Sequence, residues 1–506
     1  MSTGAGTVLT VVVLSAAGTL PVLALVGFRW PSVPLAPLGG ALLAAISAIP
    51  FLVVGGSPIG WFVALTLLCA IGTLAVWAKK PELRPARRVP NRRPLQVAIA
   101  AFAIGATAAS ALRSLSNPSI GFDTRMIWFL RAGWFLQSRH QALADIRNPG
   151  LGPTHASYPP LVSMVVALAW RLTGTHSDRL GVVVIALLNV CALAATGWFV
   201  VEAGRRLAHD TRAPALVFWS SVAVGISLIL IAAGVTSPFF TNGYADPLWS
   251  LAAVGAVGYG LVLPRASSNV AIAGLLAGVA AFTKVEGTAV AAVVVVLVTV
   301  RVLWSDREHL RGGVALGLLG LASVSVWSLV MRLLHASADV NTSGVALGSL
   351  TQRTRSTFDA AAPYLHVLEL AAVVSLVAFL ALRIDRRRAG LGSDGWTWAV
   401  LAAAVTMLGI AYVTGPGNIE FWLVSSIHRT TMYPALQAWW IVAICGLVRL
   451  AAFLGPAGED LNAKDTDKED DAFAKDTGAK HTGAHSPSED LPRVGSEDPV
   501  PYAGTP

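Results

Sequence analysis

Long apolar stretches separated by short polar loops recur along the chain from Thr7 to Gly455. Most are about 20 residues long, the length at which an α-helix spans the hydrocarbon core of a bilayer. Backbone polar groups inside hydrocarbon must be bonded within their own segment, so these stretches are expected to be helices. The pattern therefore predicts an all-α fold, a polytopic transmembrane helical bundle with about thirteen spans.

The apolar stretch at 161–172, LVSMVVALAWRL, is shorter than the others. A run of this length suits a re-entrant or interfacial helix that does not cross the bilayer. With that choice every basic loop lies on one side of the membrane, as the positive-inside rule requires: 78–94, 202–214, 264–269, 305–313 and 382–390. If 161–172 did cross, the basic loop at 202–214 would face the opposite compartment.

The densest basic loop, AKKPELRPARRVPNRRP, marks the cytoplasmic side. Four polar segments then share the extracytoplasmic face of a plasma membrane protein: 116–180, 236–246, 283–287 and 414–433. The first of these is the longest loop and is expected to contain interfacial helices, one of them over 124–140. Long loops in compact proteins are often functional.

Composition excludes a single soluble core, because 55% of the 506 residues are hydrophobic and only 13% are charged. Residues 1–28 contain no Lys or Arg, so they lack the basic region of a cleavable signal peptide and are expected to be a retained span. Residues 455–506 hold 12 of the 28 acidic residues but only 5 of the 37 basic ones. They are expected to form a disordered cytoplasmic tail.

The rest of the chain is basic, but its charges are spread over loops between spans, so nucleic-acid binding is not expected. The three cysteines lie singly in apolar runs, which predicts neither disulfides nor a thiolate metal site. P-loop, Rossmann, zinc and GxSxG motifs are absent from the sequence. The expected organisation is 1–94, extra spans with a cytoplasmic loop; 95–453, the main transmembrane module; and 454–506, the tail.

Few acids lie at the outer ends of helices, and each has two interpretations. Asp123 in GFDTR is either the N-cap of an interfacial helix or a general base at the membrane surface. Asp246 in YADPLW is either a helix-start acid before proline or a second acid facing the same compartment. His155 and Tyr158 in HASYPPL are either part of a rigid corner or part of a binding path.

Charged residues at two further points suggest anion binding. Lys284 and Glu286 in TKVEG interrupt a long apolar run, where charges normally pair or bind a ligand. Lys284 is either paired with Glu286 in a helical hairpin or bound to a phosphate at the membrane boundary. His428 and Arg429 in IHRTTMYP precede the last span, and Arg429 is either an ordinary interfacial arginine or a phosphate ligand.

Taken in order, these five motifs resemble those of the GT-C superfamily of integral-membrane glycosyltransferases, in particular bacterial relatives of protein O-mannosyltransferases and aminoarabinose transferases. The likeness covers roughly residues 95 to 453. It implies transfer of a sugar, with inversion, from a polyprenyl-phosphate donor to a hydroxyl acceptor of the cell envelope.

The resemblance also implies roles for individual residues. Asp123 and Asp246 match the acids of the first and second outer loops. The donor phosphate would be bound by Arg125, Lys284 and Arg429. Supporting or substrate-binding positions would be Glu286, His155, Tyr158 and His428.

One position departs from the family pattern, because Thr124 stands where many relatives have a second acid. This favours a reaction without a metal, although Asp123, Asp246 and Glu286 together leave a divalent ion possible. Two other functions stay open: a transporter or flippase of lipid-linked sugars, and a non-enzymatic partner of an envelope complex. A transporter would place its polar groups near the midplane of the bundle rather than at one end.

Overall fold

The computed structural model describes residues 2–27, 31–79, 120–209, 211–237, 239–305, 323–336, 350–381, 391, 394–414 and 419–455. Every regular element in this part of the chain is a helix. The expected span near 95–115, the basic loops at 306–313 and 382–390, most of the loop at 78–94 and most of the tail lie outside the described residues.

Nine helices among the described residues are long and apolar enough to cross a membrane. They are α1 (Thr3–Val26), α2 (Ser32–Val53), α3 (Pro58–Lys79), α8 (Asp178–His209), α9 (Pro214–Thr236), α12 (Val285–Ser305), α14 (Leu350–Ala381), α15 (Asp394–Thr414), and α16 (Ile419–Thr430) continued by α17 (Met432–Phe453). Shorter apolar helices are α7 (Leu161–Thr173), α11 (Ser267–Thr283) and Ser323–Leu333. The structure thus shows a multi-pass helical membrane protein.

The contacts divide the chain into a unit of Met1–Ala457 and a unit of Gly458–Pro506. Within the first unit, α2 packs against α7, α8 and α11, so the N-terminal helices share one core with the later ones. Helices α1 and α2 approach closely at glycines: a Cβ added at Gly40 would lie 1.9 Å from the carbonyl oxygen of Leu14. Small residues allow such close backbone contact between helices in lipid.

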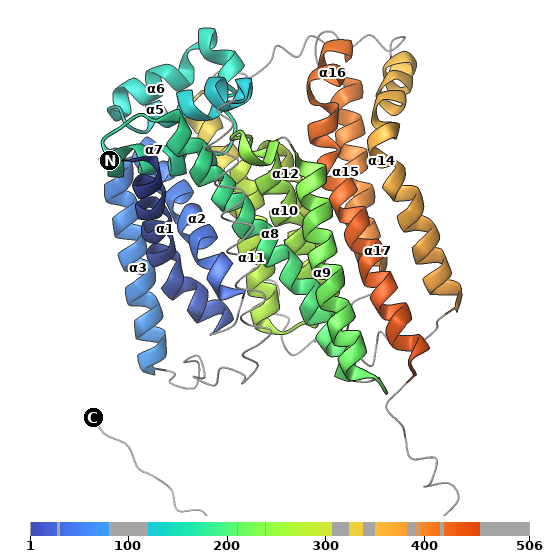
Figure 1. Ribbon diagram of the computed structural model, residues 1–506. Helices are drawn as coiled ribbons and strands as arrows, with labels where there is room; N and C mark the ends of the chain where they lie inside the picture. Colours follow the sequence, from blue (N-terminus) through green and yellow to red (C-terminus); the bar gives the residue numbers. More distant parts are fainter. Residues whose placement is uncertain are drawn as a thin grey trace, which may run out of the picture. The chain divides into compact units, whose positions relative to one another are not determined.

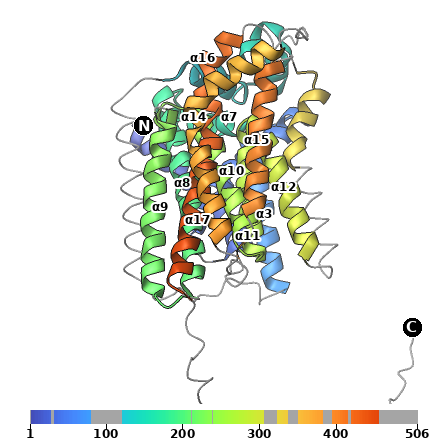
Figure 2. The ribbon, with the colours of Figure 1, turned by 90° about the vertical axis from the view of Figure 1, so that its right-hand side faces the viewer.

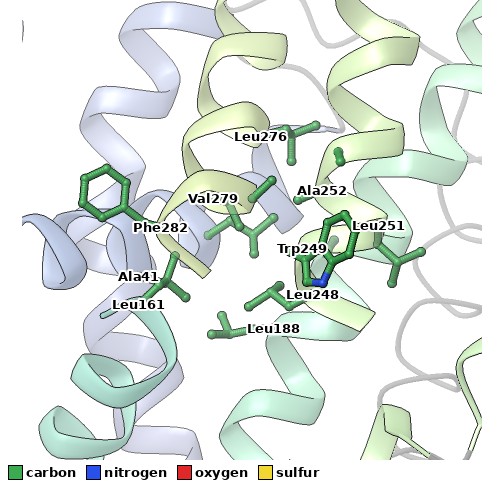
Figure 3. Close-up of a cluster of buried hydrophobic side chains, with 14 of the residues drawn as sticks. Ala41, Leu161, Leu188, Leu248, Trp249, Leu251, Ala252, Leu276, Val279 and Phe282 are labelled. Carbon is green, nitrogen blue, oxygen red and sulfur yellow. The ribbon is translucent and has the colours of Figure 1, made fainter. Parts of the chain in front are cut away.

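Helix α10 (Asp246–Val257) occupies the centre of this unit, and all its residues are buried. It packs against α8, α11, α12 and α17. Figure 3 shows the side chains of Leu248 and Trp249 from α10 beside Leu276 and Val279 from α11. A helix that is apolar on all sides is stable only when it is surrounded. The first residue of α10 is therefore carried into the interior.

The bundle has two chemically different ends. The backbone N–H of Arg212, between α8 and α9, donates to the carbonyl of Gly455 after α17 (3.2 Å), which places the basic segment 202–214 and the end of α17 together. In both views α16 lies at the opposite end, together with the short helices α5 (Leu130–Trp134) and α6 (Arg139–Arg147) (Figures 1 and 2).

The first-loop helix differs from the expectation of one amphipathic helix over 124–140. A π-helical turn, η2 (Thr124–Phe129), continues into α5, which ends at Trp134, and α6 begins after Ser138, whose hydroxyl accepts from the N–H of Gln141. This N-cap starts a new helix and explains the break. An interfacial helix over 124–140 would place six apolar side chains at the headgroups: Met126, Ile127, Phe129, Leu130, Trp134 and Phe135. Four of them are instead buried in the protein: Ile127, Phe129, Trp134 and Phe135.

Helix α7 is short, as expected, and consecutive residues from Leu161 to Trp170 are all buried. It contacts α1, α2, α5 and α8. The polar corner before it is made by η3 (Pro149–Thr154) and the residues that follow. The short segment η4 (Phe239–Thr241) precedes α10, and η5 (Gly258–Val262) follows it.

Candidate functional site

Five charged side chains from four separate segments form one chain of alternating charge, which we call the ion cluster: Glu286, Lys284, Asp246, Arg429 and Asp123. Lys284 Nζ lies 2.7 Å from Asp246 Oδ1 and 3.2 Å from Glu286 Oε1. Arg429 Nη1 donates to Asp123 Oδ2 and lies 3.9 Å from Asp246 Oδ2. The two cations thus share a central carboxylate, and each also has an outer one.

Asp246 is the most enclosed member of the ion cluster, with a side chain that is 2% exposed. It is the first residue of α10 and is followed by Pro247, which suits a helix start because proline needs no N–H partner there. No capping hydrogen bond from a side chain is found at this helix end. Asp246 therefore lies at the start of the helix, as the helix-start interpretation expects, but its carboxylate binds Lys284.

Lys284 lies at a single-residue break between two helices. Its backbone is extended (φ −155°, ψ 157°), whereas α11 ends at Thr283 and α12 begins at Val285. The junction is tight, because a Cβ at Gly287 would lie 2.2 Å from the carbonyl oxygen of Ala280. The hydroxyl of Thr288 donates to Ala281 O (2.8 Å) and fixes the same junction. The Lys284–Glu286 pair expected for a hairpin is present, and Asp246 is an additional partner.

Asp123 is held in place by contacts between its own segment and the segment before α10. The N–H of Gly121 and the hydroxyl of Thr124 both donate to Asn242 O, at 3.2 and 2.9 Å. A Cβ on Gly121 would lie 2.0 Å from the ring of Tyr244. Asp123 occupies the N-cap position of η2, but its side chain makes no capping hydrogen bond among the described residues. Its carboxylate pairs with Arg429 and is 25% exposed.

Arg429 comes from the last turn of α16, and its guanidinium carbon lies 4.9 Å above the centre of the Tyr244 ring. This stacking holds the plane of the guanidinium. Its Nε is buried and has no hydrogen-bond partner within the part of the chain that the structure describes. Burial raises the pKa of Tyr244, and the Asp123 carboxylate adds to the rise, so the phenol is neutral beside the ion cluster.

Arg125, predicted as a phosphate ligand, lies outside the ion cluster. Its Nε is 3.3 Å from Asp178 Oδ2, and the two side chains are 61% and 40% exposed. Asp178 begins α8, so the pair joins the first loop to the next long helix. Exposed pairs of this kind contribute little to stability.

The predicted aromatic and histidine positions lie beside other rings. His155 stacks on Tyr158 with ring centres 4.5 Å apart, and its backbone is left-handed (φ 50°). Tyr158 also packs near Trp128, at 5.8 Å. His428 lies against Phe239 (5.0 Å) and Tyr364 (6.4 Å). Although adjacent to Arg429 in sequence, His428 makes none of the ion pairs of the cluster.

Sequence reasoning missed three supporting residues at this end. The ring of Tyr244 stacks against the guanidinium of Arg429. The sequence indicated this residue only as an aromatic position two residues before Asp246. Gly121 and Gly287 make close approaches that only a residue without Cβ allows, and both lie inside motifs already noted. The glycines in those motifs could have been interpreted as points of close helix packing.

A metal site is not supported in the part of the chain that the structure describes. No group of three or more His, Cys, Asp or Glu side chains is arranged there to hold an ion. Instead, Lys284 lies between Asp246 and Glu286, and Arg429 lies between Asp123 and Asp246. The cations neutralise the carboxylates that a metal would require.

The ion cluster combines two capacities. Lys284 and Arg429 can stabilise an anion, and the partly exposed carboxylates Asp123 and Glu286 can accept a proton. No protein-family model matches the chain, and searches among curated proteins and solved structures yield no match.

Proposed function

We propose that the protein is an inverting glycosyltransferase that moves a sugar from a polyprenyl-phosphate donor to a hydroxyl acceptor of the cell envelope. The supporting observation is the ion cluster: two cations fixed on one buried carboxylate, with a partly exposed carboxylate beside them, at one end of a membrane bundle. A lipid-linked phosphate is an anion held near the bilayer surface. Cations at the ends of membrane helices can bind such a phosphate at the bilayer surface, where a water-soluble substrate would not be concentrated.

Each residue of the cluster has a role in this reaction. Asp123 accepts the proton of the acceptor hydroxyl, whose oxygen attacks the anomeric carbon from the side opposite the phosphate. The bond between the anomeric carbon and the phosphate oxygen breaks, and its electron pair leaves with that oxygen. Lys284 and Arg429 stabilise the charge that grows there. Asp246 holds both cations in place and Glu286 orients Lys284.

The remaining predicted residues have lesser roles in this proposal. The stacked pair His155 and Tyr158 would line the acceptor path, and His428 would support the neighbouring arginine. Arg125 is engaged by Asp178 and exposed, so its predicted part in binding the donor phosphate is weaker than that of Arg429.

The active end is proposed to face outward from a plasma membrane. The ion cluster includes Arg429 of α16, at the opposite end of the bundle from the basic segment 202–214 (Figure 1). Basic loops favour the cytoplasm. A sugar donor would then be used after it has been presented on the outer leaflet.

One observation favours the alternative, a transporter or flippase of lipid-linked sugars. Tyr433, Gln437 and Trp440 follow one another at helical spacing along α17 after Arg429. Each has a buried polar atom to which no described residue is hydrogen-bonded. Gln437 and Trp440 line a cavity of about 10 Å³. That volume accommodates one water molecule and no sugar. The transferase proposal rests on the ion cluster and not on this cavity.

The chemical fate of the sugar distinguishes the two. Proteoliposomes containing the protein, a radiolabelled polyprenyl-phosphate sugar and an envelope extract as acceptor should release unlabelled polyprenyl phosphate and carry label on the acceptor. A flippase would leave the label on the lipid and change only the leaflet from which it can be extracted. Intact donor after incubation, with label exchanged between leaflets, would refute the transferase.

A further inference from the structure

The order of charges in the ion cluster limits how an anion can bind there. The cluster contains three carboxylates, Asp123, Asp246 and Glu286, and two cations, Lys284 and Arg429. Each cation already contacts two carboxylates. A phosphate that approached without displacing one of them would add negative charge to an anionic site, which is unfavourable at low dielectric.

The two kinds of carboxylate differ in how readily they can leave. Asp246 is 2% exposed and contacts both cations, so its removal would leave two buried cations without their shared partner. Asp123 and Glu286 are each 25% exposed and each contacts one cation. The carboxylate of Asp123 can therefore be rehydrated at low cost, whereas that of Asp246 cannot, and Glu286 has its Oε2 buried.

Arg429 is the cation better suited to exchange partners. It binds Asp123 through Nη1 alone, although a guanidinium can bind an oxyanion through two parallel N–H groups. Its Nε is buried, and none of the described residues gives it a hydrogen-bond partner. The ring of Tyr244 holds the guanidinium plane independently of Asp123. A phosphate could thus replace the contact of Asp123 with Nη1 alone by two hydrogen bonds from the guanidinium of Arg429, which the Tyr244 ring already orients.

We propose that the donor phosphate displaces Asp123 from Arg429, so that the carboxylate becomes a free base only when the donor is bound. The exchange rests on the proposed glycosyltransferase function and adds an order of binding to it. A carboxylate oxygen that accepts a hydrogen bond from a guanidinium is occupied and is not available to an acceptor hydroxyl. Before the donor binds, the Arg429–Asp123 pair keeps the base occupied. Once the phosphate has taken its place, Asp123 lies beside the reacting sugar.

The neighbouring contacts allow this movement without unfolding the segment. Gly121 and Thr124 remain bonded to Asn242 through groups other than the carboxylate. Rotation of the Asp123 side chain alone breaks the ion pair. The flanking side chain of Phe122 is 74% exposed, so it does not pack the carboxylate in place.

Direct binding of an undecaprenyl phosphate without sugar tests the exchange independently of catalysis. The protein would be placed in nanodiscs and the dissociation constant measured for wild type, Asp123→Asn and the matched control Asp145→Asn. The control removes one acidic charge from α6, outside the ion cluster. Because Asp123→Asn removes the competing carboxylate, it should bind the lipid phosphate about fivefold more tightly than wild type, while Asp145→Asn should bind as wild type does.

Three further arms identify the ligand and the cation concerned. Undecaprenol, which lacks phosphate, should bind wild type and Asp123→Asn equally. Inorganic phosphate should compete poorly, because it lacks the lipid chain. Glu286→Gln relieves Lys284 of its outer carboxylate, so tightening in this variant but not in Asp123→Asn would place the exchange at Lys284 and overturn the proposal.

The possible failures are distinct. Equal or weaker binding by Asp123→Asn, with wild type binding the lipid phosphate, would refute the exchange and leave the transferase proposal standing. Wild-type affinity for undecaprenyl phosphate no greater than for undecaprenol would refute both. If Asp123→Asn does not fold, Asp123→Ser provides the same removal of charge with a smaller side chain, and the same tightening is expected.

Discussion

The ammonium of Lys284 donates a hydrogen bond to the carboxylate of Asp246 across 2.7 Å, although 38 positions separate the two residues in the chain. Both side chains are almost fully buried, at 8% and 2% exposed. The pair joins the break between α11 and α12 to the start of the central helix α10.

Loss of the central carboxylate should destabilise the protein strongly. Asp246→Asn leaves two enclosed cations short of a counter-ion, and breaking a buried pair in this way costs about 3 kcal/mol or more. Thermal unfolding in detergent would measure the change. Asp178→Asn, which breaks the exposed pair with Arg125, is the matched control and should cost less than about 1 kcal/mol. Equal effects of the two variants would show that Asp246 is not a buried partner.

The glycine after Glu286 is expected to be essential for the position of Lys284. Gly287→Ala places a Cβ 2.2 Å from Ala280 O, so α11 and α12 must separate, at a cost of about 1–3 kcal/mol. Gly274→Ala, in α11 with no atom within 4 Å of its added Cβ, should be neutral or slightly stabilising. The two melting temperatures give the comparison, and a neutral Gly287→Ala would contradict the tight junction.

The ring of Tyr244 should matter more than its hydroxyl. Tyr244→Phe keeps an aromatic face under Arg429, whereas Tyr244→Leu removes it. Loss of a cation–π contact of about 1 kcal/mol corresponds to roughly fivefold weaker donor binding. Dissociation constants for undecaprenyl phosphate should therefore rise in Tyr244→Leu and stay near wild type in Tyr244→Phe. The reverse order would indicate that the hydroxyl, not the ring, supports the site.

Much of this arrangement follows from the sequence because it depends on two general rules, the length of apolar runs and the distribution of basic loops. Apolar length predicts the helices, and the positive-inside rule orders the loops, so 116–180, 236–246, 283–287 and 414–433 were expected on one face. The structure brings Asp123, Asp246, Lys284 and Arg429 from these segments into one cluster. The number of about thirteen spans stays a prediction, because nine candidates occur among the described residues and the expected span near 95–115 lies outside them.

Which arginine pairs with which carboxylate could not be predicted from these rules. Arg125 is two positions from Asp123, yet it turns to Asp178, whereas Arg429 reaches Asp123 from 306 positions away. The direction of a long side chain depends on the packing of the helix that carries it, and here that helix begins with a π-helical turn. Hydrophobic periodicity does not distinguish such a turn from a regular one.

The different surroundings of the two arginines lead to opposite expectations. Arg125→Gln should reduce sugar transfer by no more than about twofold, because the side chain is exposed and paired elsewhere. Arg429→Gln should reduce it by at least about 100-fold, since it removes a cation from the leaving group. Initial rates on membranes with equal amounts of protein would compare them. A larger loss in Arg125→Gln would assign the phosphate to the first loop instead.

Asp123 is proposed to take the proton of the acceptor, and the rate of sugar transfer by a variant without this carboxylate tests that role. Membranes containing wild type or Asp123→Asn would be incubated with a radiolabelled polyprenyl-phosphate sugar, and label on the acceptor followed over time. The variant is expected to be present at wild-type level and to transfer sugar at least about 100-fold more slowly than wild type. Transfer at the wild-type rate by Asp123→Asn would contradict it.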